Sequence, residues 1–535
     1  MLKVDSGRAR DRSRQPTGRR AGTANGAKSE LRRTERLVIP LFQETRSLPP
    51  GEWLSAKELD GGLSRIVARA LDERRFKGEP GESLLLLAPE RGRVESVALF
   101  GLGPEKKCTL DSLRKAFGAL SRRSRREQVG EVTLDLDAPH LRSKLSELGW
   151  DRAAKAITMA WTQGGYSFDA YRPAPASVAE KKKPARLVLW AGAEDAEIER
   201  AVRAGQASGQ IVGDAANYVR DLANTPANDL YPERLAEHAR SLARAHGLSF
   251  SLLKKRDLER QRMGCLLGVA QGSDRPPCLM TVGYRARSGA KKAGKKVPTL
   301  VLVGKAITFD CGGISIKPAK GMEEMKFDMA GGAAVLGAMR AVAELKPAAN
   351  VIGVIPSAEN AIGGSAMRPG DILRSAAGKT VEILNTDAEG RLILADALHY
   401  AARFKPDYVM DFATLTGACL VALGTQVSGL VSNDREFSRK VFEAGERSGE
   451  RVWELPLYDE FLDATKSTVA DLKNSAGRNG GAITAAAFLS HFVGKTPWCH
   501  LDIAGTAWTE RESGPFVAGA TGVGVALVEE LLRAL

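Results

Sequence analysis

The chain has 535 residues, of which 43% are hydrophobic and 27% charged, and its formal net charge is +14. This composition is typical of a globular protein, and the length favours more than one domain, because single cores rarely grow beyond about 250–300 residues. No apolar run reaches the ~20 residues that a membrane-spanning helix needs, and the basic N-terminus lacks the apolar stretch of a signal peptide. The six cysteines are dispersed without a CxxC pair, which favours free thiols. We therefore expect a cytoplasmic protein that contacts no membrane.

Residues 1–36 carry half of the excess positive charge. They contain eleven Lys and Arg against four Asp and Glu, which leaves a net +7, and almost no large apolar side chains. Such a segment cannot bury enough surface to fold, so we expect a disordered basic tail. It could bind nucleic acid or an acidic partner. A solvated tail without any partner explains the same composition.

Strand-like and helix-like segments alternate between residue 37 and about residue 190. Apolar runs typical of strands cover 37–42, 83–87, 97–100, 132–136 and 187–190, and helical spacing covers 63–71 and 110–120. This alternation predicts an N-terminal α/β domain over residues 37–195 with a largely parallel sheet, and we find no catalytic cluster in it. A charged, proline-containing stretch at 181–185 precedes a long helix expected over 197–216, so we place the domain boundary at 180–205.

Polar residues gather where the apolar strands of the second half end. The continuous apolar run 299–304 is typical of a central parallel strand, and it leads to Lys305, Asp310 and the Gly312-Gly313 pair. Asp328 precedes a small-residue helix expected over 330–343. Burying an unpaired carboxylate or ammonium is costly, so such groups pair with one another or bind a metal. These residues alone leave both explanations open.

The segment NTDAEGRL, residues 385–392, lies between a strand-like run at 381–384 and a helix-like run at 392–401. On an extended backbone Asp387 and Glu389 point to the same side, where they repel each other unless a cation lies between them. Arg391 at the start of a helix favours a nearby anion. In the alternative interpretation, Asp387 only caps the helix. None of the six histidines has zinc-site spacing, so a metal centre would rest mostly on carboxylates.

Four ordered segments resemble the leucyl aminopeptidase (cytosol aminopeptidase) family: VGKAITFDCGG at 303–313, ISIKP at 314–318, MKFDMAGGAA at 325–334 and NTDAEGRL at 385–392. Further segments are similar to the same family: NTPAND at 224–229, ATLTGAC at 413–419, GAITAAAFL at 481–489 and HLDIAGTAW at 500–508. The resemblance is close over residues 205–535 and loose before them. It implies an α/β fold with an N-terminal macro-like domain over 37–195. A C-terminal catalytic domain over 205–535 would have a central, mostly parallel or mixed sheet flanked by helices.

The resemblance also implies a two-metal site. Lys305, Asp310, Asp328 and Glu389 would hold one divalent ion, and Asp310, Asp387 and Glu389 the second. Lys305 can ligate only as a neutral amine, so the ions would have to lower its pKa below the usual ~10.4. Mn²⁺ is the first candidate, with Zn²⁺ or Mg²⁺ as alternatives.

The family assigns roles to further residues of these motifs. Lys317 is implied to polarise the scissile carbonyl, and Arg391 to anchor a bicarbonate ion. Met325 would shape the pocket for the first side chain, although a methionine there could simply be core. The substrate cleft would be lined by Thr414, Leu415 and Gly417. Cys311 stands where the family usually has Ser or Thr, and Ala306 where glycine is common.

We therefore predict a cytoplasmic two-metal aminopeptidase that hydrolyses the N-terminal bond of peptides through a metal-bridged hydroxide. The resemblance implies a preference for leucine and other apolar N-terminal residues, and a homo-hexameric assembly. One alternative is a nucleic-acid-binding protein on the same scaffold, which would use the basic tail and surface. Another is a related metallo-exopeptidase with a different preference, such as dipeptides with Cys-Gly ends.

Overall fold

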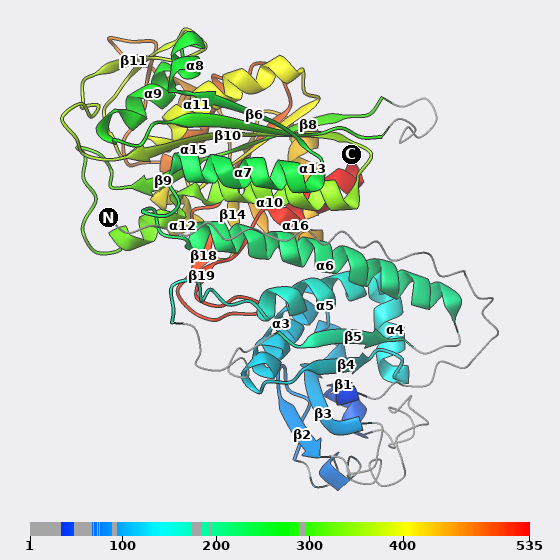
Figure 1. Ribbon diagram of the computed structural model, residues 1–535. Helices are drawn as coiled ribbons and strands as arrows, with labels where there is room; N and C mark the ends of the chain where they lie inside the picture. Colours follow the sequence, from blue (N-terminus) through cyan, green and yellow to red (C-terminus); the bar gives the residue numbers. More distant parts are fainter. Residues whose placement is uncertain are drawn as a thin grey trace, which may run out of the picture.

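The computed structural model (Figure 1) describes residues 34–47, 67, 69–71, 73, 75–87, 94–173, 184–191, 195–287 and 296–535. The predicted basic tail lies outside these residues except for Thr34–Arg36, which form the start of strand β1 (Thr34–Phe42). Of the helix predicted over 63–71, residues 67 and 69–71 are described, and they are helical. Within the described ranges no helix is long and apolar enough to cross a membrane.

The N-terminal domain is built on a five-stranded sheet in the order β2-β3-β1-β4-β5. Its strands are β1, β2 (Ser83–Leu87), β3 (Val94–Gly103), β4 (Glu131–Asp135) and β5 (Arg186–Trp190). Apart from β2, which runs antiparallel to β3, neighbouring strands are parallel, as the alternation of strands and helices predicted. Its other elements are η1 (Glu44–Ser47), η2 (Glu105–Lys107), α3 (Leu110–Arg126), α4 (Pro139–Leu148) and α5 (Trp150–Gly164).

Helix α6 (Ala196–Asn224) lies between the two sheets (Figure 1). Asp195 caps its N-terminus, where Oδ1 accepts from the backbone N–H of Glu197 at 2.9 Å. Glycines at positions 205, 209 and 213 form one stripe, because residues four apart share a helix face. A Cβ atom at 209 would lie 2.5 Å from the carbonyl oxygen of Lys155, so this stripe lets α5 pack closely on α6. Helices α10 (Ala330–Leu345) and α16 (Val525–Ala534) also contact α6, which therefore joins both domains.

The second half forms a nine-stranded mixed sheet in the order β15-β14-β17-β13-β8-β10-β7-β6, with β9 also paired to β10. Strands β8, β10, β13 and β17 are parallel. Strand β7 is antiparallel to β10 and to β6, and β14 is antiparallel to β17 but parallel to β15. The run 299–304 is the central strand that its apolar composition predicted. The strands are β6 (Ser249–Lys254), β7 (Cys278–Tyr284), β8 (Thr299–Gly304), β9 (Ala306–Asp310), β10 (Asn350–Asn360), β13 (Tyr408–Ala413), β14 (Ser428–Ser432), β15 (Val452–Glu454) and β17 (Trp498–Asp502).

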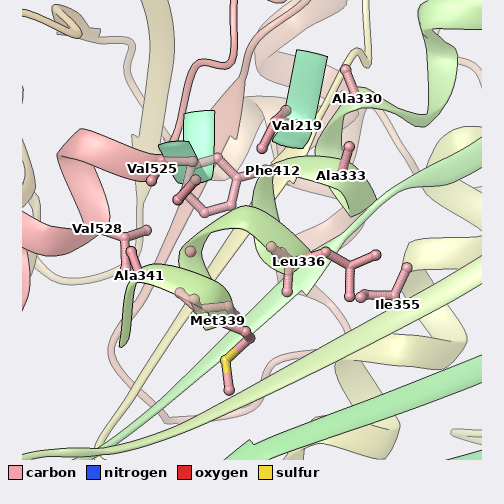
Figure 2. Close-up of a cluster of buried hydrophobic side chains, with 14 of the residues drawn as sticks. Val219, Ala330, Ala333, Leu336, Met339, Ala341, Ile355, Phe412, Val525 and Val528 are labelled. Carbon is pink, nitrogen blue, oxygen red and sulfur yellow. The ribbon is translucent and has the colours of Figure 1, made fainter. Parts of the chain in front are cut away.

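Both faces of this sheet are buried. Leu300 and Leu302 of β8 belong to one core cluster, and Val301 and Val303 to the other, as the two-residue period of a strand requires. The first cluster includes residues of α7 (Pro232–His246), α10, α13 (Arg435–Ser448) and α16. Figure 2 shows part of it, with α10 side chains against Phe412 of β13 and Val525 of α16. The second cluster includes residues of α8 (Lys255–Arg260), α9 (Gly264–Val269), α11 (Gly390–Ala401) and α15 (Gly481–Ser490).

Smaller elements surround the central sheet. Strands β11 (Ile372–Arg374), β12 (Thr380–Glu382) and β16 (Leu472–Lys473) form a three-stranded sheet, and β18 (Trp508–Thr509) pairs with β19 (Gly519–Ala520). The remaining helices are η4 (Ala270–Gly272), η5 (Met322–Met329), η6 (Ala402–Phe404), α12 (Gly417–Leu423) and α14 (Asp459–Asp463). All six cysteines are free thiols, as their dispersed spacing predicted.

Candidate metal centre

The predicted site residues meet beyond the carboxyl ends of the central parallel strands, which is where open α/β sheets usually bind ligands. Lys305 directly follows β8, and Asp310 ends β9. Asp328 lies in η5, Glu389 directly precedes α11, and Thr414 directly follows β13. Segments that are far apart in the sequence thus deliver charged side chains to one place.

Lys305 is buried at the centre of this group. Its Nζ lies 2.8 Å from Asp328 Oδ1 and 2.8 Å from Glu389 Oε1, and it donates to the carbonyl of Thr414 at 3.0 Å. Gly390 makes room for the lysine, because a Cβ atom there would lie 2.5 Å from Lys305 Cε. The glycine of the NTDAEGRL segment is therefore required by the side chain of a residue between β8 and β9.

Lys317 provides the second ammonium group. Its Nζ lies 2.8 Å from Asp310 Oδ2 and also pairs with Asp387 Oδ1. The chain returns from Asp310 to Lys317 through Gly312 and Gly313, whose φ angles of 87° and 65° are in the left-handed region that favours glycine. The Lys317 side chain is 21% exposed, so it lies at the open side of the cluster.

Negative charge exceeds positive charge in this group: four carboxylates face two ammonium groups. Burial and the charge of Glu389 raise the pKa of Asp310 to about 7. Burial also raises the pKa of Asp328 well above its usual value. Burial lowers the pKa of Lys305, but the charges of Asp328, Glu389 and Asp310 outweigh it and raise that pKa. Each lysine here is thus a cation held by carboxylates that repel one another.

The carboxylates fit divalent cations. Ligand oxygens of Asp310, Asp387 and Glu389 all lie within 4.8 Å of one another. Asp328 Oδ2 is buried and has no hydrogen-bond partner among the residues that the structure describes. Buried carboxylate oxygens without partners are costly, and oxygen donors are what hard and borderline divalent ions prefer. The excess of two negative charges equals the charge of one such ion. Loss of the Lys305 proton, which ligation by that amine requires, would raise the excess to three and favour a second ion.

The backbone of residues 385–389 is not extended, so the condition under which Asp387 and Glu389 were expected to point to the same side is not met. Strand β12 ends at Glu382, Thr386 and Asp387 lie in a turn, and Glu389 occupies the N-cap position of α11. Asp387 is therefore not the helix cap of the alternative interpretation. The Asn385 side chain accepts from the Asp387 N–H at 2.9 Å, which stabilises this turn. Asp387 and Glu389 reach the same cluster because the chain turns between them.

Asn474, which the sequence analysis did not single out, holds this turn in place. Its Oδ1 accepts from the N–H of Leu384 at 2.8 Å and of Asn385 at 3.3 Å. Its Nδ2 donates to the carbonyls of Asn385 at 2.6 Å and Ala388 at 3.4 Å. A single asparagine more than eighty residues from the motif resembles any loop residue in sequence, so only the fold reveals this role.

Asn360 acts in the same way on the other side of the cluster, and it too escaped the sequence analysis. Its Nδ2 donates to Asp310 Oδ1 at 2.7 Å and to the carbonyl of Thr386 at 3.0 Å. The N–H of Gly312 also donates to Asp310 Oδ1, at 2.8 Å. These bonds fix one oxygen of Asp310 and leave Oδ2 directed at Lys317.

Arg391 is buried beside this turn. Its Nη1 donates to the carbonyl of Asn474 at 2.7 Å, while its Nε has no hydrogen-bond partner within the described part of the chain. Burial lowers the pKa of Arg391 to about 10. A buried guanidinium with an unused donor fits an oxyanion, which accepts strong charge-assisted hydrogen bonds.

The predicted substrate-binding residues are joined to the cluster to different degrees. Thr414 is tied to it directly, because its Oγ1 donates to Asp328 Oδ1 at 2.7 Å. Asp502, another residue that the sequence analysis missed, accepts from the N–H of Leu415 at 3.1 Å and thereby fixes the loop after β13. Gly417 begins α12, and Met325 is half-buried in η5, three residues before Asp328.

Comparisons with known proteins agree with the resemblance read from the motifs. Residues 217–529 match the profile described as "Cytosol aminopeptidase family, catalytic domain", and residues 38–175 match the N-terminal domain of the same family. A probable cytosol aminopeptidase of Geotalea uraniireducens (strain Rf4) is 44% identical over 480 residues, which is 89% of this chain and 92% of the relative. One of Alkaliphilus metalliredigens (strain QYMF) is 39% identical over 499 residues, 93% of this chain and 96% of the relative.

Solved structures give the same result. The bottromycin maturation enzyme BotP in complex with Mn is 32% identical, covers 94% of this chain and 99% of its own, and has a TM-score of 0.77. A mutant of tomato leucine aminopeptidase is 32% identical, covers 95% of both chains and has a TM-score of 0.80.

Proposed function

Because the chain belongs to the cytosol aminopeptidase family, we propose that its cluster of four carboxylates holds two divalent cations used in peptide hydrolysis. Family membership makes the protein a metallo-exopeptidase that acts on the N-terminal end of peptides. The observation that carries the metal proposal is the uncompensated charge: four buried or half-buried carboxylates face two ammonium groups, and Asp328 Oδ2 has no partner in the described chain.

The proposed ligands divide into two overlapping sets. Lys305, Asp310, Asp328 and Glu389 would hold one ion, and Asp310, Asp387 and Glu389 the other. Such ions supply Lewis acidity, which activates a water molecule for attack and polarises a carbonyl. The lysine would have to ligate as the neutral amine, so its protonation at ordinary pH opposes binding until the ions displace the proton.

Lys317 is the residue that we assign to the scissile carbonyl. Its position at the open side of the cluster supports this role, since its ammonium can face a substrate there. Neutralisation of Asp310 and Asp387 would weaken its two ion pairs and free its N–H groups to stabilise a developing oxyanion. Without metal, the neighbouring carboxylates outweigh burial and raise the pKa of Lys317 above its ordinary value.

Arg391 is the residue that we assign to a bound bicarbonate. Its unused, buried Nε and its fixed contact with Asn474 support an anion at this point. A basic oxyanion held there could accept a proton from the attacking water, a task for which the carboxylates would be unsuited once they hold cations.

The substrate preference, the metal, the cellular location and the assembly are proposals that we take from the family. We propose a preference for leucine and other apolar N-terminal residues, with Met325, Thr414, Leu415 and Gly417 at the substrate cleft. We also propose Mn²⁺ as the first ion to test, with Zn²⁺ and Mg²⁺ next, and a cytoplasmic homo-hexamer. The Mn in the BotP complex supports the choice of metal. The nucleic-acid alternative depends mainly on residues 1–33, which lie outside the described residues, and no structural observation favours it.

Hydrolysis of aminoacyl-anilides by the full chain tests the proposal. The enzyme stripped by a chelator should be inactive and should recover with Mn²⁺, and Asp387→Ala should stay inactive at every metal concentration. Asp463→Ala is the matched control, because Asp463 is an exposed carboxylate that pairs with Lys466 on the surface. Leucyl-anilide should be cleaved faster than glutamyl-anilide or lysyl-anilide. Full activity after chelation, together with an active Asp387→Ala variant, would refute the two-metal proposal.

A further inference from the structure

A second buried arginine with unused donors lies at the contact between the two domains. Arg114 extends from α3 of the N-terminal domain, and its side chain is 8% exposed. Its Nη2 donates to the carbonyl of Arg447 at the end of α13. Its Nε and Nη1 have no hydrogen-bond partner among the described residues, and no carboxylate of those residues lies within ion-pair distance. A guanidinium in this state is costly to bury.

The arginine lines a cavity of about 140 Å³ between the domains. A single water needs only ~10–15 Å³ of such space, so a small ion with its hydration also fits. The walls also carry hydroxyl groups, which can donate to a ligand when no protein acceptor uses them. Thr425 and Ser513 have hydroxyl groups that donate to no acceptor in the described chain, whereas those of Ser428, Thr506, Thr509 and Thr521 are already bonded within the protein.

The charged groups around this cavity leave the positive charge of Arg114 without a direct partner. Asp111 is shared by two other cations, with Oδ2 at 2.9 Å from Lys115 Nζ and 3.2 Å from Arg451 Nη2. Glu450 is committed to the N-terminus of α16, where its Oε2 accepts from the N–H of Gly524 at 3.0 Å and of Leu527 at 2.8 Å. Three cations and two carboxylates therefore line the space.

Another buried arginine shows how this fold treats a purely structural guanidinium. Arg220 donates from Nε to the carbonyl of Ala520 at 3.0 Å and from Nη1 to the carbonyl of Gln163 at 2.8 Å. Its guanidinium also lies over the ring of Tyr166, 3.9 Å from the centroid. Only its Nη2 lacks a partner in the described chain, and Arg220 does not line the cavity. Arg114 has one backbone acceptor and leaves two nitrogens unused.

We propose that this cavity binds a small oxyanion, either phosphate or the carboxylate of a small organic acid, with Arg114 as its principal charged ligand. The planar fork of arginine and the hydroxyl groups of Thr425 and Ser513 suit an anion with several acceptor oxygens. The ligand would contact α3 of one domain and residues 425–428 and 506–514 of the other. Its binding would therefore strengthen the contact between the domains by mass action.

Thermal unfolding of the metal-loaded full chain tests this site. The unfolding midpoint should rise in a saturable way with phosphate or with acetate, relative to chloride at the same ionic strength. The more effective of the two anions shows whether the site prefers phosphate or a carboxylate. Arg114→Met should weaken the apparent affinity at least about tenfold, because it removes charge-assisted hydrogen bonds. Arg123→Met is the matched control, since Arg123 is exposed on the same helix and pairs with Glu127. Equal responses to all three anions, or an unchanged affinity in Arg114→Met, would refute the site.

A measurement on the wild-type protein covers the case in which Arg114→Met fails to fold. Crystals of the metal-loaded enzyme soaked in selenate should show an anomalous peak within hydrogen-bonding distance of the Arg114 guanidinium. Absence of that peak at a selenate concentration that saturates the thermal response would contradict the proposal, because the stabilising anion would then bind elsewhere.

Discussion

One group of buried charges lies within the central sheet and another beyond its strand ends, and the two groups differ in how completely the protein balances their charge. Asp411 of β13 and His500 of β17 face each other in the parallel register, with His500 Nδ1 2.6 Å from Asp411 Oδ1. Trp498 Nε1 donates to the other oxygen, Oδ2, at 2.7 Å. Each oxygen of this carboxylate thus has one partner, and both residues are fully buried. His500 Nε2 has no hydrogen-bond partner in the described chain, so the pair is balanced in charge but not in every hydrogen bond.

The cluster of Lys305, Asp310, Asp328, Lys317, Asp387 and Glu389 is not balanced in this way. Its carboxylates outnumber its ammonium groups, and one buried oxygen of Asp328 has no partner in the described chain. A balanced buried pair stabilises a fold or fixes its register, whereas an unbalanced group requires something from outside the chain. Burial of charge alone therefore does not identify the functional site, but the missing counter-charge does.

Asp310→Asn should have the largest effect and should act on activity and stability in opposite directions. Activity should fall by more than the roughly 10–100-fold that is typical of residues that only support metal ligands. The metal-free protein should unfold at the same or higher temperature, because one of four mutually repelling carboxylates is gone. Anilide hydrolysis and calorimetry of the chelated protein measure the two effects. A variant that keeps its activity, or whose metal-free form is clearly less stable, would show that the carboxylates are balanced after all.

Lys317→Met should have the second-largest effect. Its kcat should be lower by about 10²–10³-fold, which is the loss typical of one oxyanion donor. Metal affinity should not fall, since removing an ammonium leaves the carboxylates more negative. Titration with Mn²⁺ by calorimetry and kinetics at saturating metal separate these quantities. Lys320→Met, a change at an exposed lysine in the same loop, is the control and should leave both unchanged. If saturating metal restored kcat, Lys317 would be only a structural counter-ion.

Asn474→Ala should have an intermediate effect, a loss of about 10–100-fold in metal affinity. The change removes the hydrogen bonds to Leu384, Asn385 and Ala388 that hold the turn carrying Asp387 and Glu389. Excess Mn²⁺ should restore most of the activity, because the ligands themselves are still present. Asn433→Ala offers a matched control, since Asn433 also links two loops, through Thr496 and Trp498. Equal losses in the two variants would mean that the effect is general destabilisation.

The part of the site that could be predicted from sequence is the part encoded in contiguous motifs. Lys305, Asp310, Asp328 and Glu389 were expected to meet because the motifs that carry them resemble those of the cytosol aminopeptidase family, and the structure brings them together. The α/β class with a largely parallel N-terminal sheet was predicted because strand-like apolar runs alternate with segments of helical spacing, and the structure confirms it.

The supporting residues could not be predicted, because their importance depends on contacts across the fold. Asn360, Asn474 and Asp502 use ordinary side chains to hold backbone groups far away in the sequence. The turn at 385–389, which replaces the extended backbone considered from sequence, could not be predicted either, because the Asn385 side chain and Asn474 stabilise it. Local patterns indicate which groups carry charge, whereas the turn that aims them is set by distant partners.

Asp411→Asn should have the smallest effect on catalysis and a clear effect on stability. Loss of one partner of a buried pair typically costs about 3–5 kcal/mol, while metal affinity and kcat should change little because neither residue belongs to the cluster.

Burial lowers the pKa of His500, but the charge and hydrogen bond of Asp411 outweigh it and raise that pKa. A raised folded-state pKa contributes stability that is complete below the unfolded value of ~6.5 and is lost as pH rises through the folded value. The urea midpoint of the wild type should therefore decline more steeply from pH 6 to pH 9 than that of Asp411→Asn. If the urea midpoints of both proteins depended on pH in the same way, His500 would be neutral over this range. It would then contact Asp411 only as a neutral hydrogen-bond donor.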